Sequence, residues 1–187
     1  MYVDRVIYPV NALGPGNRVA IWVAGCNRRC IKCANPELWY RHDYQRISSY
    51  QLASNIEKTI GYGMEGITMT GGEPFDQAEE LADMLERLSE KQEILVFTGY
   101  LYEDLVKKAE VKRLLDKVDV LVDGEYIDEL NDNFSTLRGS SNQRIIYLNE
   151  SVRQKYEDYI KEGRKIQNFI YDYNTVSVGI HNRENQM

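Results

Sequence analysis

Residues 66–88, GITMTGGEPFDQAEELADMLERL, decide the fold that we expect for this chain. Gly66–Thr70 predicts a buried strand, Gly71-Gly72-Glu73 a tight turn, and Pro74 the first residue of a helix. The predicted helix has one apolar face, made by Phe75, Ala78, Leu81, Ala82, Leu85 and Leu88. A strand, a turn and an amphipathic helix in this order form one βα unit.

The alternation of strands and helices continues on both sides of this unit. Strands are predicted at residues 4–9, 18–24, 94–98, 118–123 and 144–148. Helices are predicted from Ser48 and Ser49 to Gly61 and over about 102–115. Strands that alternate with helices predict an α/β fold with a parallel sheet that is covered on both faces.

The chain of 187 residues is short enough for a single domain, which we expect to span 1–187 with a core at about 6–148. Residues 149–187 are predicted as a C-terminal extension, a helix over about 149–162 followed by a hairpin from Gln167 to Ile180 that turns around Asp172-Tyr-Asn174. The last seven residues are expected to fray.

Composition and charge narrow the classes of function. The chain is 43% hydrophobic and 28% charged, which is typical of a globular protein, and its formal net charge is −6. This sign disfavours a nucleic-acid partner. No apolar run is long enough to span a membrane and no signal peptide is evident, so we expect a cytoplasmic protein without a membrane partner.

The three cysteines, Cys26, Cys30 and Cys33, fall within eight residues and are odd in number, which favours a metal centre over disulfides. Zinc is one alternative, but a fourth ligand would have to come from His42 or His181, and neither spacing fits a common zinc pattern. His181 near the chain end is predicted to be structural or exposed. A 4Fe-4S cluster is the other alternative, and three cysteines would leave one iron open for a substrate. An open iron favours an enzyme over an electron carrier.

Two motifs together resemble the radical S-adenosylmethionine (SAM) superfamily: Cys26-x-x-x-Cys30-x-x-Cys33 after an early strand, and Gly71-Gly72-Glu73-Pro74 after a later one. Within that superfamily, four further stretches over about residues 6–148 are similar to the activating enzymes of anaerobic (class III) ribonucleotide reductases. They are Gly14-Pro-Gly-x-Arg18, Phe97-Thr-Gly-Tyr100, Val120-Leu-Val-Asp-Gly124 and Arg138-Gly-Ser-Ser-Asn-Gln-Arg144.

The resemblance implies an open partial (β/α)6-type TIM barrel and one 4Fe-4S cluster whose open iron binds SAM. It implies a radical SAM oxidoreductase that receives an electron from a flavodoxin or ferredoxin, cleaves SAM reductively and generates a glycyl radical on the large anaerobic reductase. One alternative is a radical SAM enzyme that acts on another glycyl-radical enzyme or modifies a peptide. A further alternative is a non-catalytic iron-sulfur sensor or electron carrier.

The resemblance and the predicted strand ends also suggest residues that contact SAM. In the family, the glycine-rich turn exposes backbone groups to the amino end of SAM, which here implies contacts from Gly71, Gly72 and Glu73. The two glycines allow the close approach that such contacts need. The family often has an aromatic residue where this chain has Lys32, so we expect only the backbone around Lys32, Cys33 and Ala34 to contact adenine. Three further candidates are polar residues at strand ends or in a turn: Thr98, Asp123 and Asn142.

Overall fold

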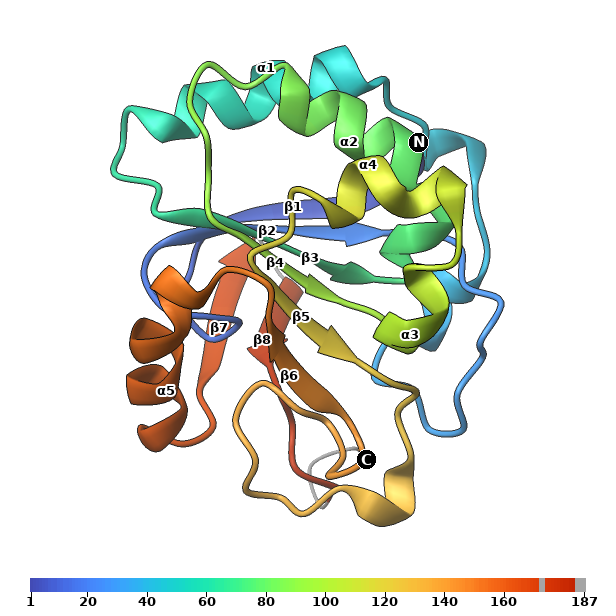
Figure 1. Ribbon diagram of the computed structural model, residues 1–187, viewed down its shortest axis with the longest axis vertical. Helices are drawn as coiled ribbons and strands as arrows, with labels where there is room; N and C mark the ends of the chain where they lie inside the picture. The colour runs from blue at the N-terminus through green and yellow to red at the C-terminus, as the bar shows by residue number, and fades with distance from the viewer. Residues whose placement is uncertain (172–173, 184–187) are drawn as a thin grey trace.

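The computed structural model describes residues 1–171 and 174–183. Its main feature is one six-stranded sheet whose strands lie side by side in their sequence order (Figure 1). The strands are β1 (Val3–Val10), β2 (Arg18–Val23), β3 (Gly66–Gly71), β4 (Ile94–Phe97), β5 (Val120–Asp123) and β6 (Arg144–Tyr147). All six predicted strands are therefore present, with ends that differ by one or two residues.

The parallel arrangement that the sequence predicts holds for the centre of the sheet only. Strands β2, β3, β4 and β5 are parallel, whereas β1 pairs with β2 and β6 pairs with β5 in the antiparallel direction. Only the four central strands are connected through helices. A short loop over 11–17 joins β1 to β2, which is the kind of connection that antiparallel neighbours allow.

One face of the sheet is covered by helices that follow the chain from β2 to β5 (Figure 1). They are α1 (Ser49–Ile60), α2 (Ala78–Glu86) and α4 (Lys112–Leu115). Ser48 begins α1, because its side chain accepts a hydrogen bond from the backbone of Gln51, and Gly61 ends it as predicted. A 3₁₀ turn at Pro74–Gln77 precedes α2 and carries the chain out of the glycine turn.

The single helix predicted over about 102–115 is wrong. The structure has α3 (Tyr102–Leu105), a 3₁₀ turn at Ala109–Val111 and then α4. Leu105 and Val111 are both buried, yet six positions along a continuous helix would place them about a third of a turn apart around its axis. The break allows both side chains to reach the core.

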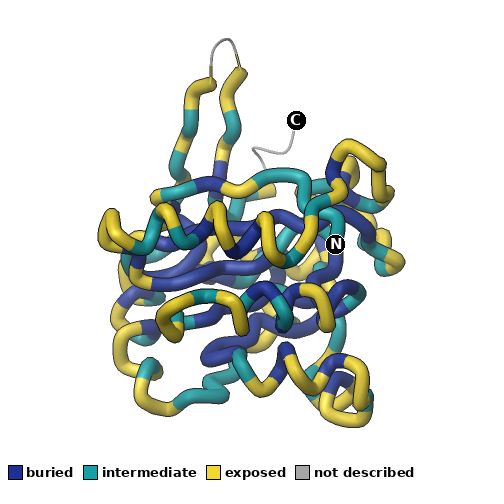
Figure 2. The backbone as a smooth tube through the Cα atoms, turned by 90° about the horizontal axis from the view of Figure 1, so that it is seen from above, coloured by how far each residue is buried: buried dark blue, intermediate teal, exposed yellow. Residues whose placement is uncertain are grey.

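The C-terminal extension covers the opposite face of the sheet. It consists of α5 (Arg153–Lys161) and the antiparallel hairpin β7 (Ile166–Tyr171) and β8 (Asn174–Gly179). Tyr156 of α5 packs against Val120 and its neighbours, and Val178 of β8 packs with Trp22. Figure 2, seen from the side of α1, α2 and α4, shows buried segments among exposed ones, and the hairpin projecting with exposed residues near its end.

The described part of the C-terminal segment is more ordered than the sequence predicts. The predicted hairpin is present, but residues 172–173 of its turn lie outside the described residues. The expectation that the last seven residues fray is wrong for His181, Asn182 and Arg183, which are held by hydrogen bonds to the rest of the chain. Residues 184–187 lie outside the described part. In the described chain, no helix combines the length and the apolar character needed to cross a membrane.

Candidate functional site

Most of the predicted metal and cofactor residues converge on a cavity at the carboxyl ends of the parallel strands. The cysteine loop follows β2, the glycine turn follows β3, and Thr98 and Gly124 follow β4 and β5. Cavities of α/β enzymes form at this edge because the loops after parallel strands meet there. The predicted residues that line the cavity are Cys26, Cys30, Cys33, Ala34, Gly71, Gly72, Glu73 and Thr98.

Backbone hydrogen bonds shape the cysteine loop. The Gly25 N–H donates to the Leu38 carbonyl at 2.8 Å, and the Cys26 N–H donates to the Trp39 carbonyl at 3.1 Å, so the loop returns to its own start. Arg29 and Lys32 adopt left-handed backbone angles, with φ of 49° and 56°. These two tight bends bring all three thiols, each partly buried, to the same cavity.

The three thiols are free, and in a 4Fe-4S cluster each of them would bind a different iron atom. Burial raises the pKa of Cys30 to about 11 and raises that of Cys26, so binding of a metal has to release protons. Among the described residues, no three His, Cys, Asp or Glu side chains lie close enough to hold a single metal ion. The thiolates of a cubane bind different iron atoms and lie farther apart than the ligands of one ion. The zinc alternative therefore has no preformed site in the described part of the chain.

The glycine turn packs directly on the base of the cysteine loop. The Gly72 N–H donates to the Val23 carbonyl at 2.7 Å, and the Glu73 N–H donates to the Gly25 carbonyl at 2.9 Å. A Cβ atom on Gly72 would overlap the Gly25 carbonyl, and Gly71 has a φ of +102° that favours glycine. Glycines at these positions allow the turn and the cysteine loop to share one cavity wall.

Both carboxylate oxygens of Glu73 accept hydrogen bonds, which connect the loops after β3 and β4. Its Oε1 accepts hydrogen bonds from the Thr98 hydroxyl at 2.7 Å and from the Phe75 N–H at 3.1 Å, and its Oε2 accepts from the Gly99 N–H at 2.8 Å. Burial raises the pKa of this carboxyl to about 7 despite these three donors. Thr98, another predicted cofactor residue, thus supports Glu73 from the cavity wall.

Two buried donors beside the cysteines have no hydrogen-bond partner within the described chain. They are the indole Nε1 of Trp39 and the Nε of Arg28, and both residues line the cavity. A buried N–H without an acceptor is costly, whereas an anionic iron-sulfur cluster offers sulfur atoms that accept hydrogen bonds. The three thiols, the glycine turn and these two donors fit a 4Fe-4S cluster with a ligand bound beside it.

Three predicted cofactor residues do not line the cavity. Lys32 is exposed, and its ammonium lies 2.8 Å from the carboxylate of Asp128. Asp123 is buried and forms an ion pair with Arg144. The Asn142 amide donates to the Glu125 carbonyl at 2.8 Å. Contact of these three residues with SAM stays a prediction.

The structure adds cavity residues that the sequence prediction missed, above all Gly179, Ile180 and His181 at the end of the hairpin. His181, which the prediction left outside the site, lines the same cavity as the cysteines. A signal for this was present in the alternation of Val176, Val178 and Ile180, which predicts a strand with one buried face. A strand that packs on the sheet carries the residues after it to the edge of the sheet.

Comparisons with known proteins agree with this geometry. A family model described as a 4Fe-4S single cluster domain matches residues 12–146. The chain is 36% identical over 155 residues to the anaerobic ribonucleoside-triphosphate reductase-activating protein of Enterobacteria phage T4, with 78% of this chain and 93% of that protein covered. It is 30% identical over 150 residues to the protein of that name from Escherichia coli strain K12, with 75% and 96% covered. For the Haemophilus influenzae protein the values are 30% over 147 residues, with 74% and 93% covered.

Proposed function

The chain belongs to the family of anaerobic ribonucleoside-triphosphate reductase-activating proteins, and from this premise we propose that it activates an anaerobic ribonucleotide reductase. We further propose that it does so as a radical SAM oxidoreductase, with one 4Fe-4S cluster and SAM in the cavity at the strand ends. The observation that carries this proposal is the shared cavity of the three thiols and the glycine turn.

The architecture supports an open partial barrel of the radical SAM type. Its strands follow one another in chain order, the four central strands are parallel, and β1 and β6 are the edges of the sheet. A barrel with a gap between its edge strands admits a large protein substrate to the strand ends. The three free thiols suit the reducing cytoplasm, where we place the activity.

Each group of residues has a distinct role in this proposal. Cys26, Cys30 and Cys33 would hold three irons of the cluster and leave the fourth without a protein ligand. The backbone of Gly71 and Gly72 would lie beside the amino end of SAM, because the absence of side chains allows a close approach. The unpartnered N–H groups of Arg28 and Trp39 would donate to the cluster sulfurs and stabilise their negative charge.

A bound cluster would pass one electron, received from an external donor, to SAM, and the radical chemistry of the cleaved SAM would remove a hydrogen atom from a glycine of the reductase. A flavodoxin or ferredoxin suits the role of electron donor. The charged residues that line a second opening beside Cys26 are Arg29, Arg41 and Asp76, so its rim carries a net positive charge in a chain whose net charge is −6. An acidic electron carrier complements this rim.

The test uses anaerobically reconstituted protein with dithionite, SAM and an anaerobic ribonucleotide reductase from the same organism. We expect 5′-deoxyadenosine in the reaction and a glycyl-radical signal in the electron paramagnetic resonance (EPR) spectrum of the reductase. Cys30→Ala should abolish both, whereas Asn27→Ala, an exposed residue of the same loop, should retain both.

Each outcome decides one part of the proposal. Protein that holds four irons and yields no 5′-deoxyadenosine would exclude radical SAM chemistry and favour an iron-sulfur sensor or carrier. Cleavage of SAM without a radical on the reductase would point to another protein or peptide substrate.

A further inference from the structure

The end of the C-terminal extension lies against the cavity of the proposed cofactor site. Gly179, Ile180 and His181 line this cavity together with the three cysteines. These three residues lie beyond residues 12–146, the part of the chain that matches the family model. The extension is therefore a candidate for a wall of the site that the family domain does not include.

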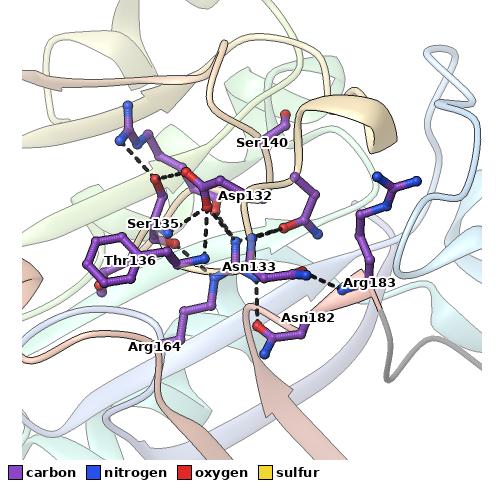
Figure 3. Close-up of polar contacts among 12 residues, drawn as sticks. Asp132, Asn133, Ser135, Thr136, Ser140, Arg164, Asn182 and Arg183 are labelled. Carbon is purple, nitrogen blue, oxygen red and sulfur yellow. Dashed lines mark hydrogen bonds and ion pairs between the residues drawn. The ribbon is translucent and has the colours of Figure 1, made fainter.

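A buried guanidinium, that of Arg164, holds this segment in place (Figure 3). Its Nη1 donates to the His181 carbonyl and to the Asn182 side chain, each at 3.0 Å. Its Nε donates to the Ser135 carbonyl at 3.1 Å, and its Nη2 donates to the Asn131 side chain at 2.9 Å. One side chain thus ties the end of the hairpin to the loop between β5 and β6.

A second connection reaches the cysteine loop. The Arg183 N–H donates to the Asn133 side chain at 2.7 Å, and the Arg183 guanidinium lies 3.1 Å from Oδ2 of Asp128. The same carboxylate oxygen lies 2.8 Å from the ammonium of Lys32, which sits between Cys30 and Cys33. The buried Asp128 carboxylate therefore joins the chain end to the loop that holds the thiols.

At this end of the cavity, most polar side chains are already bonded to the protein. Gln143 accepts from the Gly139 and Ser140 N–H groups and donates to the Gly124 carbonyl. Asn131 is bonded to Arg164. His181 also lines the cavity, and its carbonyl accepts a hydrogen bond from Arg164. Among residues 1–171 and 174–183, no side chain or backbone group hydrogen-bonds its imidazole, so the ring nitrogens are available to a ligand.

We propose that Gly179–Arg183 forms a wall of the SAM site, that His181 hydrogen-bonds the nucleoside part of the bound cofactor, and that Arg164 positions the segment. This inference rests on the proposed function, since it takes SAM to be the ligand of the cavity. The cysteines and the glycine turn, after β2 and β3, would receive the methionine end. The nucleoside end would then extend toward the loop after β5, to which Arg164 fixes the hairpin end.

The test compares the two histidines of the chain. SAM affinity is measured by isothermal titration calorimetry on anaerobic, cluster-loaded protein for the wild type, His181→Ala, His181→Gln and His42→Ala. His42 is exposed, stacks on Tyr44 and does not line the cavity, so His42→Ala is the matched control. Iron and sulfide contents show that each variant holds the same cluster.

We expect the Kd for SAM to rise about tenfold in His181→Ala, which is the loss of roughly one good hydrogen bond. His181→Gln should recover part of the affinity, and His42→Ala should match the wild type. Hydrogen exchange at Gly179–Arg183 should slow when SAM binds. Arg164→Lys should make exchange there faster and weaken SAM binding while the iron content stays the same.

Wild-type affinity in His181→Ala, or an equal loss in His42→Ala, would overturn the inference and leave the proposed function intact. Unchanged SAM affinity with slower radical transfer to the reductase would also overturn it, because the ring would then contact the protein substrate. Wild-type protein that holds four irons and does not bind SAM would instead refute the proposed function, and the inference with it.

Discussion

The buried carboxyl of Glu73 makes the stability of this protein depend on pH, in a direction opposite to that of an ordinary ion-paired glutamate. Its pKa is about 7 in the folded chain, against about 4.5 for an unburied glutamate. Between these values the folded state holds a proton that the unfolded state has lost. Stability from this group is therefore complete below about pH 4.5 and is lost as the pH rises through about 7.

The size of the effect follows from the two pKa values. The whole shift corresponds to about 3 kcal/mol, and about 2 kcal/mol of it falls between pH 5.5 and 8. Glu73→Gln is neutral at every pH and lacks this dependence. Its single amide oxygen replaces two acceptors, so one of the Phe75 and Gly99 N–H groups loses its partner, which costs about 1–3 kcal/mol at any pH.

The assay is urea denaturation of the metal-free protein under reducing conditions, at several pH values from 5.5 to 8. We expect Glu73→Gln to be less stable than the wild type at pH 5.5, and the difference in free energy of unfolding to shrink by about 2 kcal/mol by pH 8. Thr98→Val removes a donor to the carboxylate and should move the wild-type transition to higher pH. Glu37→Gln, at an exposed carboxylate, is the control.

A free-energy difference between the wild type and Glu73→Gln that stays constant across this range would refute the reasoning. It would mean that the three hydrogen bonds to the carboxylate offset its loss of water, and that Glu73 is charged in the folded protein at every pH tested.

Three further substitutions test the glycine turn, the ion pairs of Asp128 and the buried ion pair of Arg18 with Glu93. Gly72→Ala places a Cβ against the cysteine-loop backbone, so we expect a lower iron content after reconstitution, measured by iron assay and absorbance. Asp128→Asn weakens the ion pairs with Lys32 and Arg183, and hydrogen exchange should become faster in both segments that these residues anchor. Arg18→Met removes the buried partner of the Glu93 carboxylate, which then keeps only the Lys155 ammonium and the Tyr156 hydroxyl, and denaturation should show a loss of about 3 kcal/mol.

The sequence predicted the strands and the cysteine loop well because local signals determine them. Alternate residues of β2 pack on opposite faces of the sheet, with Ile21 toward the helices and Trp22 toward the hairpin. The continuous apolar run of this strand predicts burial on both faces. The cysteine spacing and the two glycines at 71–72 are equally local. The cysteine loop and the glycine turn line one cavity because β2 and β3 are parallel neighbours, so both segments follow the same edge of the sheet.

The missed features depend on contacts between distant parts of the chain. The break between α3 and α4 is decided by where Leu105 and Val111 meet the core, which no helical propensity encodes. The placement of His181 depends on Arg164 and on Asn131, fifty positions earlier in the sequence. A lone histidine after a hairpin has no periodic pattern that would reveal such contacts.

Apolar burial explains why the hairpin end can serve as a wall without being a strong binding element itself. Val178 is buried with Trp22, and Phe169, Val176 and Ile180 pack around the same cluster, so the hairpin and α5 together cover the sheet face opposite α1, α2 and α4. This apolar burial favours the packing of the hairpin on the sheet. Arg164 then has only to fix the last few residues relative to the loop beyond β5. A change at His181 should therefore alter what the cavity binds with little effect on folding, which is what makes the comparison of the two histidines a clean test.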